Sequence, residues 1–212
     1  AHLERADPRY ETVKPDHYQT FRYRIYGLLP GQQGYWPAAK EKAEALGFRA
    51  VTMATQLHVE ASHAGQVMAT IATTIARRGT PFQPPVAFIT GGELLVTVGQ
   101  ETGIGGRNQE YVLAAALQIA GSEHIVIGAV DTDGTDGPGP QYIPGAEHLP
   151  TLAGGIVDGY TAHEAEAKGI DLHAALKRHD TTPALLALDS GILATQNAGL
   201  QDLGVVLVMG RE

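Results

Sequence analysis

The chain has 212 residues, of which 43% are hydrophobic and 18% are charged, a composition that is ordinary for a globular protein with a sizeable core. Its formal net charge of -8 argues against non-specific nucleic-acid binding, because that binding needs clustered lysine and arginine. Cysteine is absent, no apolar run approaches the roughly 20 residues that cross a bilayer and no signal peptide is visible, so the sequence predicts a cytoplasmic protein without disulfides or a membrane partner.

The first part of the chain is expected to hold a linker followed by a β-α-β-α segment. Residues 1–20 are polar and carry two prolines, which is typical of a linker or a cut end. Residues 21–80 have the spacing of a strand, a helix, a strand and a helix, predicted in that order at Phe21–Tyr26, Trp36–Leu46, Phe48–Ala54 and Glu60–Arg78. The apolar face of the last helix is expected to carry Val67, Ile71 and Ile75. This segment should pack with the domain that follows.

Residues 81–212 are expected to form the main domain. Two short apolar runs, Val86–Ile89 and Leu94–Val98, come close together in the sequence. Because their connection is too short for a parallel crossover, they are predicted to pair as a hairpin or to bend around a site. Further spacing predicts helices and strands at Arg107–Ala120, Ile125–Val130, Thr161–Lys168, Leu172–Arg178 and Val205–Met209. The predicted fold class is therefore α/β, a layered α/β/α unit with a mixed β-sheet.

A glycine-rich loop opens the predicted helix at Arg107. Gly105 and Gly106 leave backbone N–H groups unobstructed at a helix N-terminus, where the potential is positive. A phosphate oxygen placed there can accept hydrogen bonds from the backbone and from the planar fork of Arg107, and Asn108 and Gln109 could add neutral donors. The alternative interpretation is an ordinary loop with an exposed first-turn arginine.

Three aspartates follow a predicted buried strand, at Asp131, Asp133 and Asp136. Ligands gather at the carboxyl ends of strands in open α/β sheets, and clustered carboxylates there can hold Mg²⁺ or accept a proton from an attacking hydroxyl. The loop does not match a calcium-binding loop, because its sixth and twelfth positions are not the required glycine and glutamate. An Asp-Gly turn whose carboxylates cap backbone groups remains the alternative.

Two further short patterns are ambiguous. Gly91 and Gly92 allow a ligand or another backbone to approach closely, and Glu93 could orient the arginine of the glycine-rich loop or a substrate hydroxyl, but a plain turn has the same composition. His179 and Asp180 could be a base and its partner, although a histidine at a helix C-terminus commonly interacts with the helix dipole.

The order of these patterns closely resembles the MOFRL-type glycerate 2-kinases. Gly-Gly-Glu, then Gly-Gly-Arg-Asn-Gln-Glu opening an alanine-rich helix, then Thr-Asp-Gly-Thr-Asp-Gly-Pro and Ile-Val-Asp-Gly follow one another, and the similarity is strongest over Gly91–Gly159. The resemblance implies a two-domain kinase with its active site between the domains. It implies transfer of the γ-phosphoryl group of ATP, with Mg²⁺, to the 2-hydroxyl of D-glycerate to give 2-phosphoglycerate.

The resemblance also implies roles for individual residues. Arg107, Asp133 and Asp136 are the implied catalytic residues, and Asp131 and Asp133 are the implied metal ligands. The remaining candidates, for binding substrate or phosphate, are Gly91, Gly92, Glu93, Gly105, Gly106, Asn108, Gln109, Thr195 and Asn197.

The sequence departs from the family pattern in three places. The family's larger N-terminal domain, which carries a lysine and another glycine-rich loop, has no counterpart here. A late glycine-rich loop is replaced by the shorter Thr195–Gly199, and residues 139–152 form an insertion. We therefore expect the C-terminal portion of a glycerate 2-kinase, inactive unless the N-terminal domain is present in cis or in trans.

Two other functions stay open. Relatives of the family are also labelled hydroxypyruvate reductase, although the chain lacks a dinucleotide-binding fingerprint. A non-catalytic ligand-binding or regulatory module of the same fold is the second alternative. The oligomeric state is open as well, a homo-oligomer included.

Overall fold

The structure, a computed structural model, describes residues 7–8, 11–23, 32–100, 103–193 and 201–210. Two compact units divide the chain, Ala1–Pro30 and Gly31–Glu212. The first unit contains a short helix, α1 (Pro15–Gln19), with no buried residue. The strand predicted at Phe21–Tyr26 is wrong over Phe21–Tyr23, which is irregular and leaves Phe21 and Tyr23 exposed, and residues 24–26 lie outside the described residues.

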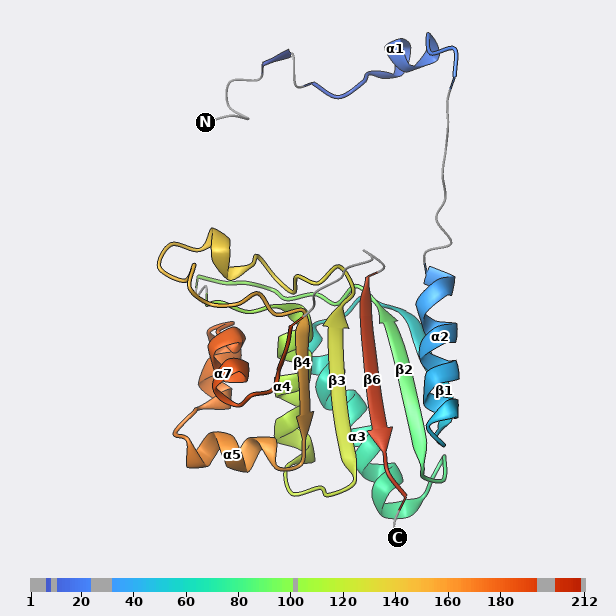
Figure 1. Cartoon of the computed structure of the whole chain (residues 1–212), viewed down its shortest axis with the longest axis vertical. Coiled ribbons are helices and arrows are strands. Elements are labelled where there is room, and N and C mark those ends of the chain that lie inside the picture. Colours follow the sequence, from blue (N-terminus) through green and yellow to red (C-terminus); the bar gives the residue numbers. More distant parts are fainter. Residues whose placement is uncertain (1–6, 9–10, 24–31, 101–102, 194–200, 211–212) are drawn as a thin grey trace. The chain divides into compact units, whose positions relative to one another are not determined.

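The second unit contains a six-stranded mixed sheet in the order β1-β2-β6-β3-β4-β5 (Figure 1). The strands are β1 (Arg49–Leu57), β2 (Val86–Gly92), β3 (Ile125–Asp131), β4 (Gly154–Asp158), β5 (Gly191–Ile192) and β6 (Asp202–Val208). β1 and β2 are parallel, whereas every other neighbouring pair is antiparallel. The predicted α/β class with a mixed sheet is therefore confirmed.

The position of β6 brings three segments of the chain together. β6 runs antiparallel between β2 and β3, so it begins at the edge where those two strands end. Its first residue, Asp202, is in register with Gly92 at the end of β2 and with Asp131 at the end of β3. Polar groups that are far apart in the sequence therefore meet at this edge of the sheet.

Helices lie on both faces of the sheet: α2 (Gln32–Ala45) contacts β1 and β2 on one face, and α3 (Ala61–Arg78) and α4 (Arg107–Ile119) contact β6, β3 and β4 on the other. The larger core joins α3 and α4 to the face that carries Phe88, Ile127 and Val206. Gly91 points to the opposite face, where a Cβ atom would lie 2.0 Å from Nε1 of Trp36 in α2. The helices are α2 (Gln32–Ala45), α3 (Ala61–Arg78), α4 (Arg107–Ile119), α5 (Thr161–Ala167), α6 (Leu172–Lys177) and α7 (Thr181–Ala187), with a 3-10 turn at Pro140–Tyr142. In the described part of the chain, no helix combines the length and the apolar character needed to span a membrane.

The contact between α3 and α4 depends on small residues. A Cβ atom on Gly65 of α3 would lie 2.1 Å from the backbone oxygen of Tyr111 in α4. The neighbouring buried positions on α3 are mostly alanines, at Ala61, Ala64, Ala69 and Ala72. Of the apolar face predicted for this helix, Ile75 is fully buried and Ile71 packs against the core, but Val67 is 56% exposed, so the prediction is wrong at Val67. Because α4 approaches α3 closely, the face of α3 that is buried is the one with glycine and alanine side chains.

The hairpin predicted from Val86–Ile89 and Leu94–Val98 is wrong. β2 continues through Gly92, and the described residues after it make only an isolated bridge, between Leu95 and Glu60. The N–H of Leu94 donates to the Asp202 carboxylate at 2.8 Å, and the N–H of Leu95 donates to the backbone oxygen of Val59 at 3.0 Å. These partners take the donors that a hairpin would need.

The other predicted helices and strands of this unit are confirmed within a few residues at their ends. The strands β4 and β5 and the helix α7 were not predicted from the sequence. Residues 139–152, predicted to be an insertion, contain the 3-10 turn.

We predict that Gly65→Ala lowers the free energy of unfolding by about 1–3 kcal/mol, because the added methyl group forces α3 away from the Tyr111 backbone. The gain in helix propensity of about 1 kcal/mol does not offset this cost. Urea denaturation of the two proteins measures the difference. Val67→Ala is the matched control and should change stability by less than about 0.5 kcal/mol. A Gly65→Ala variant as stable as the control would contradict the packing described here.

Candidate functional site

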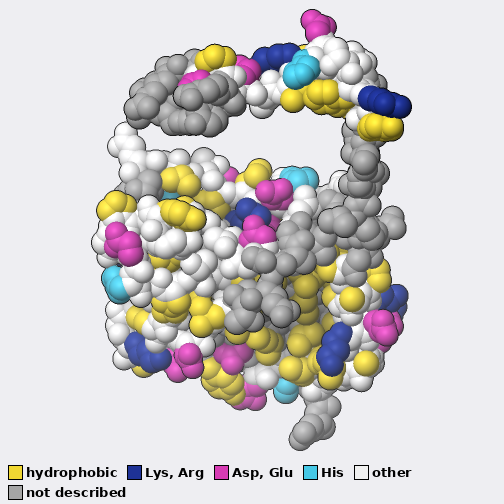
Figure 2. Space-filling view, turned by 45° about the horizontal axis from the view of Figure 1, so that its top comes forward, with side chains coloured by type: hydrophobic (Ala, Val, Ile, Leu, Met, Phe, Trp, Pro, Cys, Tyr) yellow, Lys and Arg dark blue, Asp and Glu magenta, His cyan; other side chains and the backbone are white. Residues whose placement is uncertain are grey.

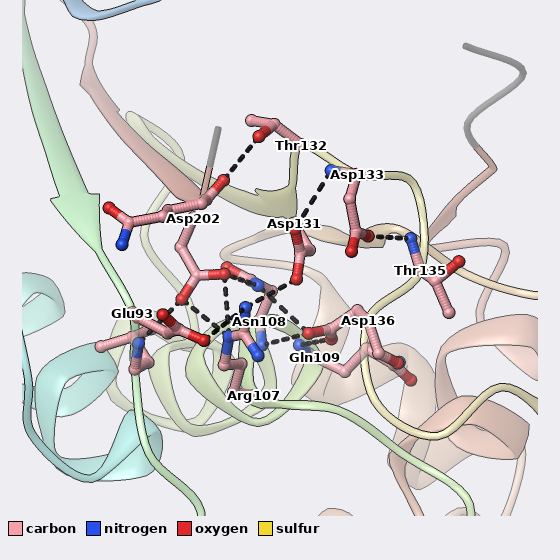
Figure 3. A network of polar contacts seen from close by, with 12 residues as sticks. Glu93, Arg107, Asn108, Gln109, Asp131, Thr132, Asp133, Thr135, Asp136 and Asp202 are labelled. Carbon is pink, nitrogen blue, oxygen red and sulfur yellow. Dashed lines mark hydrogen bonds and ion pairs between the residues drawn. The ribbon is translucent and has the colours of Figure 1, made fainter. Parts of the chain in front are cut away.

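The polar groups of the candidate site lie where β2 and β3 end and β6 begins (Figure 3). The N-terminus of α4 points into the same region, and Arg107 is its first residue. In Figure 2, which turns the top of Figure 1 forward, basic and acidic side chains lie next to each other on this edge. The site is therefore assembled from a helix N-terminus, two strand ends and one strand start.

Arg107 is the central cation of this site. Its Nε donates to both carboxylate oxygens of Asp202, at 3.0 and 2.9 Å, and its Nη2 donates to Asp131 at 2.6 Å. A carboxylate oxygen of Glu93 lies 3.9 Å from the same Nη2. Burial acts to lower the pKa of Arg107, but the hydrogen bonds and charges of Asp202 and Asp131 outweigh it and raise that pKa. The Arg107 side chain is 24% exposed, so it is oriented by buried carboxylates and still reaches the surface.

Asp202 holds this arrangement together and was not identified as a site residue from the sequence. Its side chain is almost fully buried. Besides Arg107, it accepts hydrogen bonds from the Leu94 N–H at 2.8 Å and from Nδ2 of Asn108 at 2.7 Å. The sequence offered one signal for this role: Asp202 is the only charged residue in the strand Asp202–Val208 and stands at its first position. A buried charge at a strand end is costly without partners, so it indicates a bound cation or a network of donors.

Asp136 caps helix α4 from inside the protein. Its two carboxylate oxygens accept hydrogen bonds from the N–H groups of Asn108 at 3.1 Å and Gln109 at 2.9 Å, and Nδ2 of Asn108 adds a third at 3.1 Å. Burial raises the pKa of Asp136 from 3.8 to about 6, against the opposing effect of these hydrogen bonds. The carboxylate thus faces the helix N-terminus, a place where negative charge is favoured.

The side chains of Asn108 and Gln109 are also buried and engaged within the protein. The Asn108 amide joins Asp136 to Asp202. The Gln109 amide donates to the backbone oxygen of Asp136 at 3.1 Å and accepts from Oγ1 of Thr182 at 2.7 Å. These two residues connect the aspartate loop to α4 and α7.

The candidate glycines lie in close backbone packing. A Cβ on Gly106 would lie 2.4 Å from the Asp136 carboxyl carbon, and one on Gly105 would lie 2.4 Å from Oγ1 of Thr181. Gly91 packs against Trp36, and Gly92 adopts a φ of 141° against the backbone of Leu57. Gly105 and Gly106 also line the main cavity of the site.

Asp131 is the last residue of β3, and Asp133 lies on the turn that follows it. The N–H of Asp133 donates to Asp131 at 3.1 Å, and the N–H of Thr135 donates to Asp133 at 2.8 Å. Burial and the neighbouring charges of Asp133 and Asp202 raise the pKa of Asp131 in spite of its pairing with Arg107. Among the described residues, no three acidic, histidine or cysteine side chains form a cluster that could hold a metal ion. The two carboxylates could supply only part of a metal's coordination shell.

A cavity of about 570 Å³ opens beside Arg107. Its lining includes the apolar side chains of Leu94 and Val96 and the polar side chains of Glu110 and His179. The Nδ1 atom of His179 lies 2.6 Å from Oε1 of Glu110. Burial raises the pKa of Glu110, while its hydrogen bond to His179 acts in the other direction.

The partner of His179 differs from the one suggested by the sequence. Asp180 was the suggested partner, but its carboxylate accepts from the N–H of Ile104 at 3.1 Å instead. Glu110 takes its place because α4 brings it to the cavity one turn after Arg107. Two further candidates, Thr195 and Asn197, lie outside the described residues.

Comparisons with known proteins give consistent results. Residues 86–200 match the model of the MOFRL family. A glycerate 2-kinase of Pyrococcus horikoshii is 40% identical over 172 residues, which are 81% of this chain and 36% of that protein. A relative from Agrobacterium vitis, which bears the provisional name hydroxypyruvate reductase, is 31% identical over 173 residues, or 81% of this chain and 42% of the relative. The crystal structure of a glycerate kinase from Thermotoga maritima superposes with a TM-score of 0.77 at 32% identity, over 98% of this chain and 49% of that one. The chain thus spans less than half the length of each of these proteins.

We predict that Asp136→Ala lowers the free energy of unfolding by about 2 kcal/mol at neutral pH, because buried donors at the start of α4 lose their acceptor. The raised pKa of Asp136 means that the folded protein holds this proton more tightly than the unfolded chain does. Its contribution to stability is therefore largest below about pH 4 and falls as the pH rises through about 6. The difference between wild type and variant should narrow from pH 4 to pH 7 in urea denaturation.

Asp171→Ala is the matched control for this experiment. Asp171 caps the exposed start of α6 through the Ala174 N–H at 2.9 Å, so its loss should cost about 1 kcal/mol. A difference for Asp136→Ala that widens with rising pH would contradict the raised pKa of the buried Asp136 carboxyl.

Proposed function

The chain belongs to the MOFRL family, and we propose on this basis that it is the C-terminal part of a glycerate 2-kinase. The proposed reaction transfers the γ-phosphoryl group of ATP to the 2-hydroxyl of D-glycerate and gives 2-phosphoglycerate. We further propose residues 81–212 as the MOFRL-like domain, with α2, β1 and α3 packed on it; the family match over residues 86–200 supports this assignment. The names of the relatives support the reaction class.

The observation that carries the proposal is the geometry of Arg107. Two buried carboxylates hold its Nε and Nη2 atoms, whereas Nη1 has no hydrogen-bond partner among the described residues. A guanidinium fixed in this way at a cavity wall can donate to a phosphate or carboxylate oxygen without first being reoriented. Phosphoryl transfer depends mainly on such positioning and charge neutralisation.

The site carries an excess of negative charge, so the proposed reaction requires further cations. Asp131, Asp136, Asp202 and Glu93 surround a single described arginine, so carboxylates outnumber the cation. The substrates of the proposed reaction are themselves anionic, and they would be repelled unless positive charge were added. We propose that Mg²⁺ and the N-terminal domain supply this charge.

Asp131 and Asp133 are the residues that would hold Mg²⁺ in this proposal. Asp131 presents its carboxylate at the end of β3 and Asp133 on the turn that follows, and oxygen ligands are those that Mg²⁺ prefers. When bound, the ion would supply positive charge to offset the negative charge of the phosphates during transfer. Because these two residues form only part of a coordination shell, the remaining ligands would come from phosphate, water or the other domain.

We predict that this chain alone shows no ATP-dependent phosphorylation of D-glycerate, and that activity appears when it is joined to the N-terminal domain of a MOFRL-family kinase. The joined protein is called the complete enzyme below. ADP release and the identification of 2-phosphoglycerate by NMR measure the reaction. Robust turnover by the chain alone would contradict the shared site. NADH oxidation with hydroxypyruvate would favour a reductase instead, and ligand binding without turnover would favour a non-catalytic module.

We predict that Arg107→Ala in the complete enzyme lowers kcat by about 10²-fold or more, because a charge contact in the transition state is lost. Arg107→Lys keeps the charge but not the forked hydrogen bonds, so its loss should be smaller. Thermal unfolding of both variants separates loss of function from loss of fold, since Asp131 and Asp202 lose their partner. Arg77→Ala, at an exposed position of α3, is the control and should leave kcat unchanged.

A further inference from the structure

His179 and Glu110 form a second polar pair in the cavity beside Arg107. Both residues line the same cavity as Arg107. The Glu110 side chain is 6% exposed and the His179 side chain is 22% exposed, so the carboxylate lies behind the imidazole and the imidazole reaches the cavity. Such an arrangement is typical of a carboxylate that orients a histidine.

The hydrogen bond to Glu110 defines the chemistry of the imidazole. An ionised carboxylate can only accept hydrogen bonds, so with Nδ1 of His179 at 2.6 Å from the Glu110 carboxylate, Nδ1–H is the donor. In the neutral ring the other nitrogen, Nε2, then carries the free lone pair. In the described part of the chain, Nε2 has no hydrogen-bond partner. The ring thus keeps one basic nitrogen available to a ligand.

The backbone around His179 fixes the position of the ring. His179 has a φ of 54°, a conformation that few non-glycine residues adopt. The segment on either side is bonded to the glycine-rich loop: the Gly103 N–H donates to the oxygen of Arg178 at 2.8 Å, and the Thr182 N–H donates to the oxygen of Ile104 at 2.8 Å. These bonds join the histidine to the loop that leads into Arg107.

The aspartates of the site are poorly placed to accept a proton from a substrate. Both oxygens of Asp136 accept from the start of α4, and Asp202 accepts from Arg107, Asn108 and Leu94. One oxygen of Asp131 contacts Arg107 and the other accepts from the Asp133 N–H. His179 lines the cavity and keeps Nε2 without a hydrogen-bond partner among the described residues, so it is better placed to accept a proton than these three aspartates.

We propose that His179, oriented by Glu110, is the general base of the phosphoryl transfer. As the substrate hydroxyl oxygen forms its bond to the γ-phosphorus of the nucleoside triphosphate, Nε2 accepts the hydroxyl proton. The bond between the γ-phosphorus and the bridging oxygen breaks, and the nucleoside diphosphate leaves with that electron pair. The proton on the imidazolium returns to solvent after product release. This assignment rests on the proposed kinase function.

Other charged groups also surround the imidazole. Glu60, at the start of α3, interacts electrostatically with both His179 and Glu110, and its carboxylate is hydrogen-bonded to Thr97. The same cavity is also lined by His58, Glu93 and Arg107. A change in the pH dependence of the reaction can therefore be assigned to His179 only by substituting that residue, because several other titratable groups lie close to it.

The test uses substitutions that suit the backbone at residue 179, measured in the complete enzyme. Asparagine and glycine both tolerate a positive φ, so His179→Asn and His179→Gly remove the base with little backbone strain. We expect each to lower kcat by about 10²-fold or more, with a much smaller change in the KM for D-glycerate. The decrease of kcat at low pH should disappear in both variants. His163→Asn, at an exposed position of α5, is the control and should behave as wild type.

Two further measurements separate a catalytic from a structural role. Added imidazole should restore part of the activity of His179→Gly, increasingly as the pH rises, because only neutral imidazole accepts a proton. Glu110→Gln should lower kcat less than His179→Asn does and should shift the low-pH decrease. Circular dichroism checks that each variant is folded.

The possible results distinguish this inference from the proposed function. An active wild type whose His179→Asn variant keeps its kcat and pH profile would overturn the assignment of the base alone, as would a folded His179→Gly variant without imidazole rescue. A complete enzyme with no kinase activity toward D-glycerate would overturn the proposed function, and the base assignment with it.

Discussion

The contact of Arg107 with Asp202 and Asp131 is the interaction on which the rest of the site depends. It joins the first residue of α4, the first residue of β6 and the last residue of β3. A partly buried guanidinium is stable only with hydrogen-bonded carboxylates, and buried carboxylates are stable only with donors or cations. Each partner therefore requires the others, and the helix N-terminus is fixed to the edge of the sheet. The surrounding amides extend the same network to the aspartate loop.

The chemistry of the site follows from how its charges are divided between inside and outside. Asp136 and Asp202 face inward and organise the backbone, while one side of the guanidinium and the His179 ring face the cavity. In the proposed mechanism, an arginine that neutralises charge and a histidine that accepts a proton are thus supported by carboxylates behind them. On the same proposal, a site rich in acidic residues binds anionic substrates once further cations are added.

The sequence predicted most of the long elements and the glycine-rich and aspartate loops, because helical and alternating spacing is strong there. It failed where tertiary contacts decide the outcome. Leu94–Val98 has the composition of a strand, but its backbone donors go to Asp202 and Val59. Val67 fits the apolar period of its helix, yet the approach of α4 buries the glycine and alanine face. The partnership of His179 with Glu110 crosses 69 residues, and no local pattern encodes such a contact.

The central place of β6 has a consequence for how the protein is made. β6 is the last strand in the sequence, but it lies in the middle of the sheet, between β2 and β3. During translation β2 and β3 leave the ribosome before β6, the strand that pairs with both of them. Until then each exposes an unpaired edge, which is a hazard for aggregation. Arg107 likewise cannot form its ion pair with Asp202 until that part of the chain has been synthesised. A nascent chain therefore cannot complete this sheet, or the edge that holds Arg107, until β6 has been synthesised.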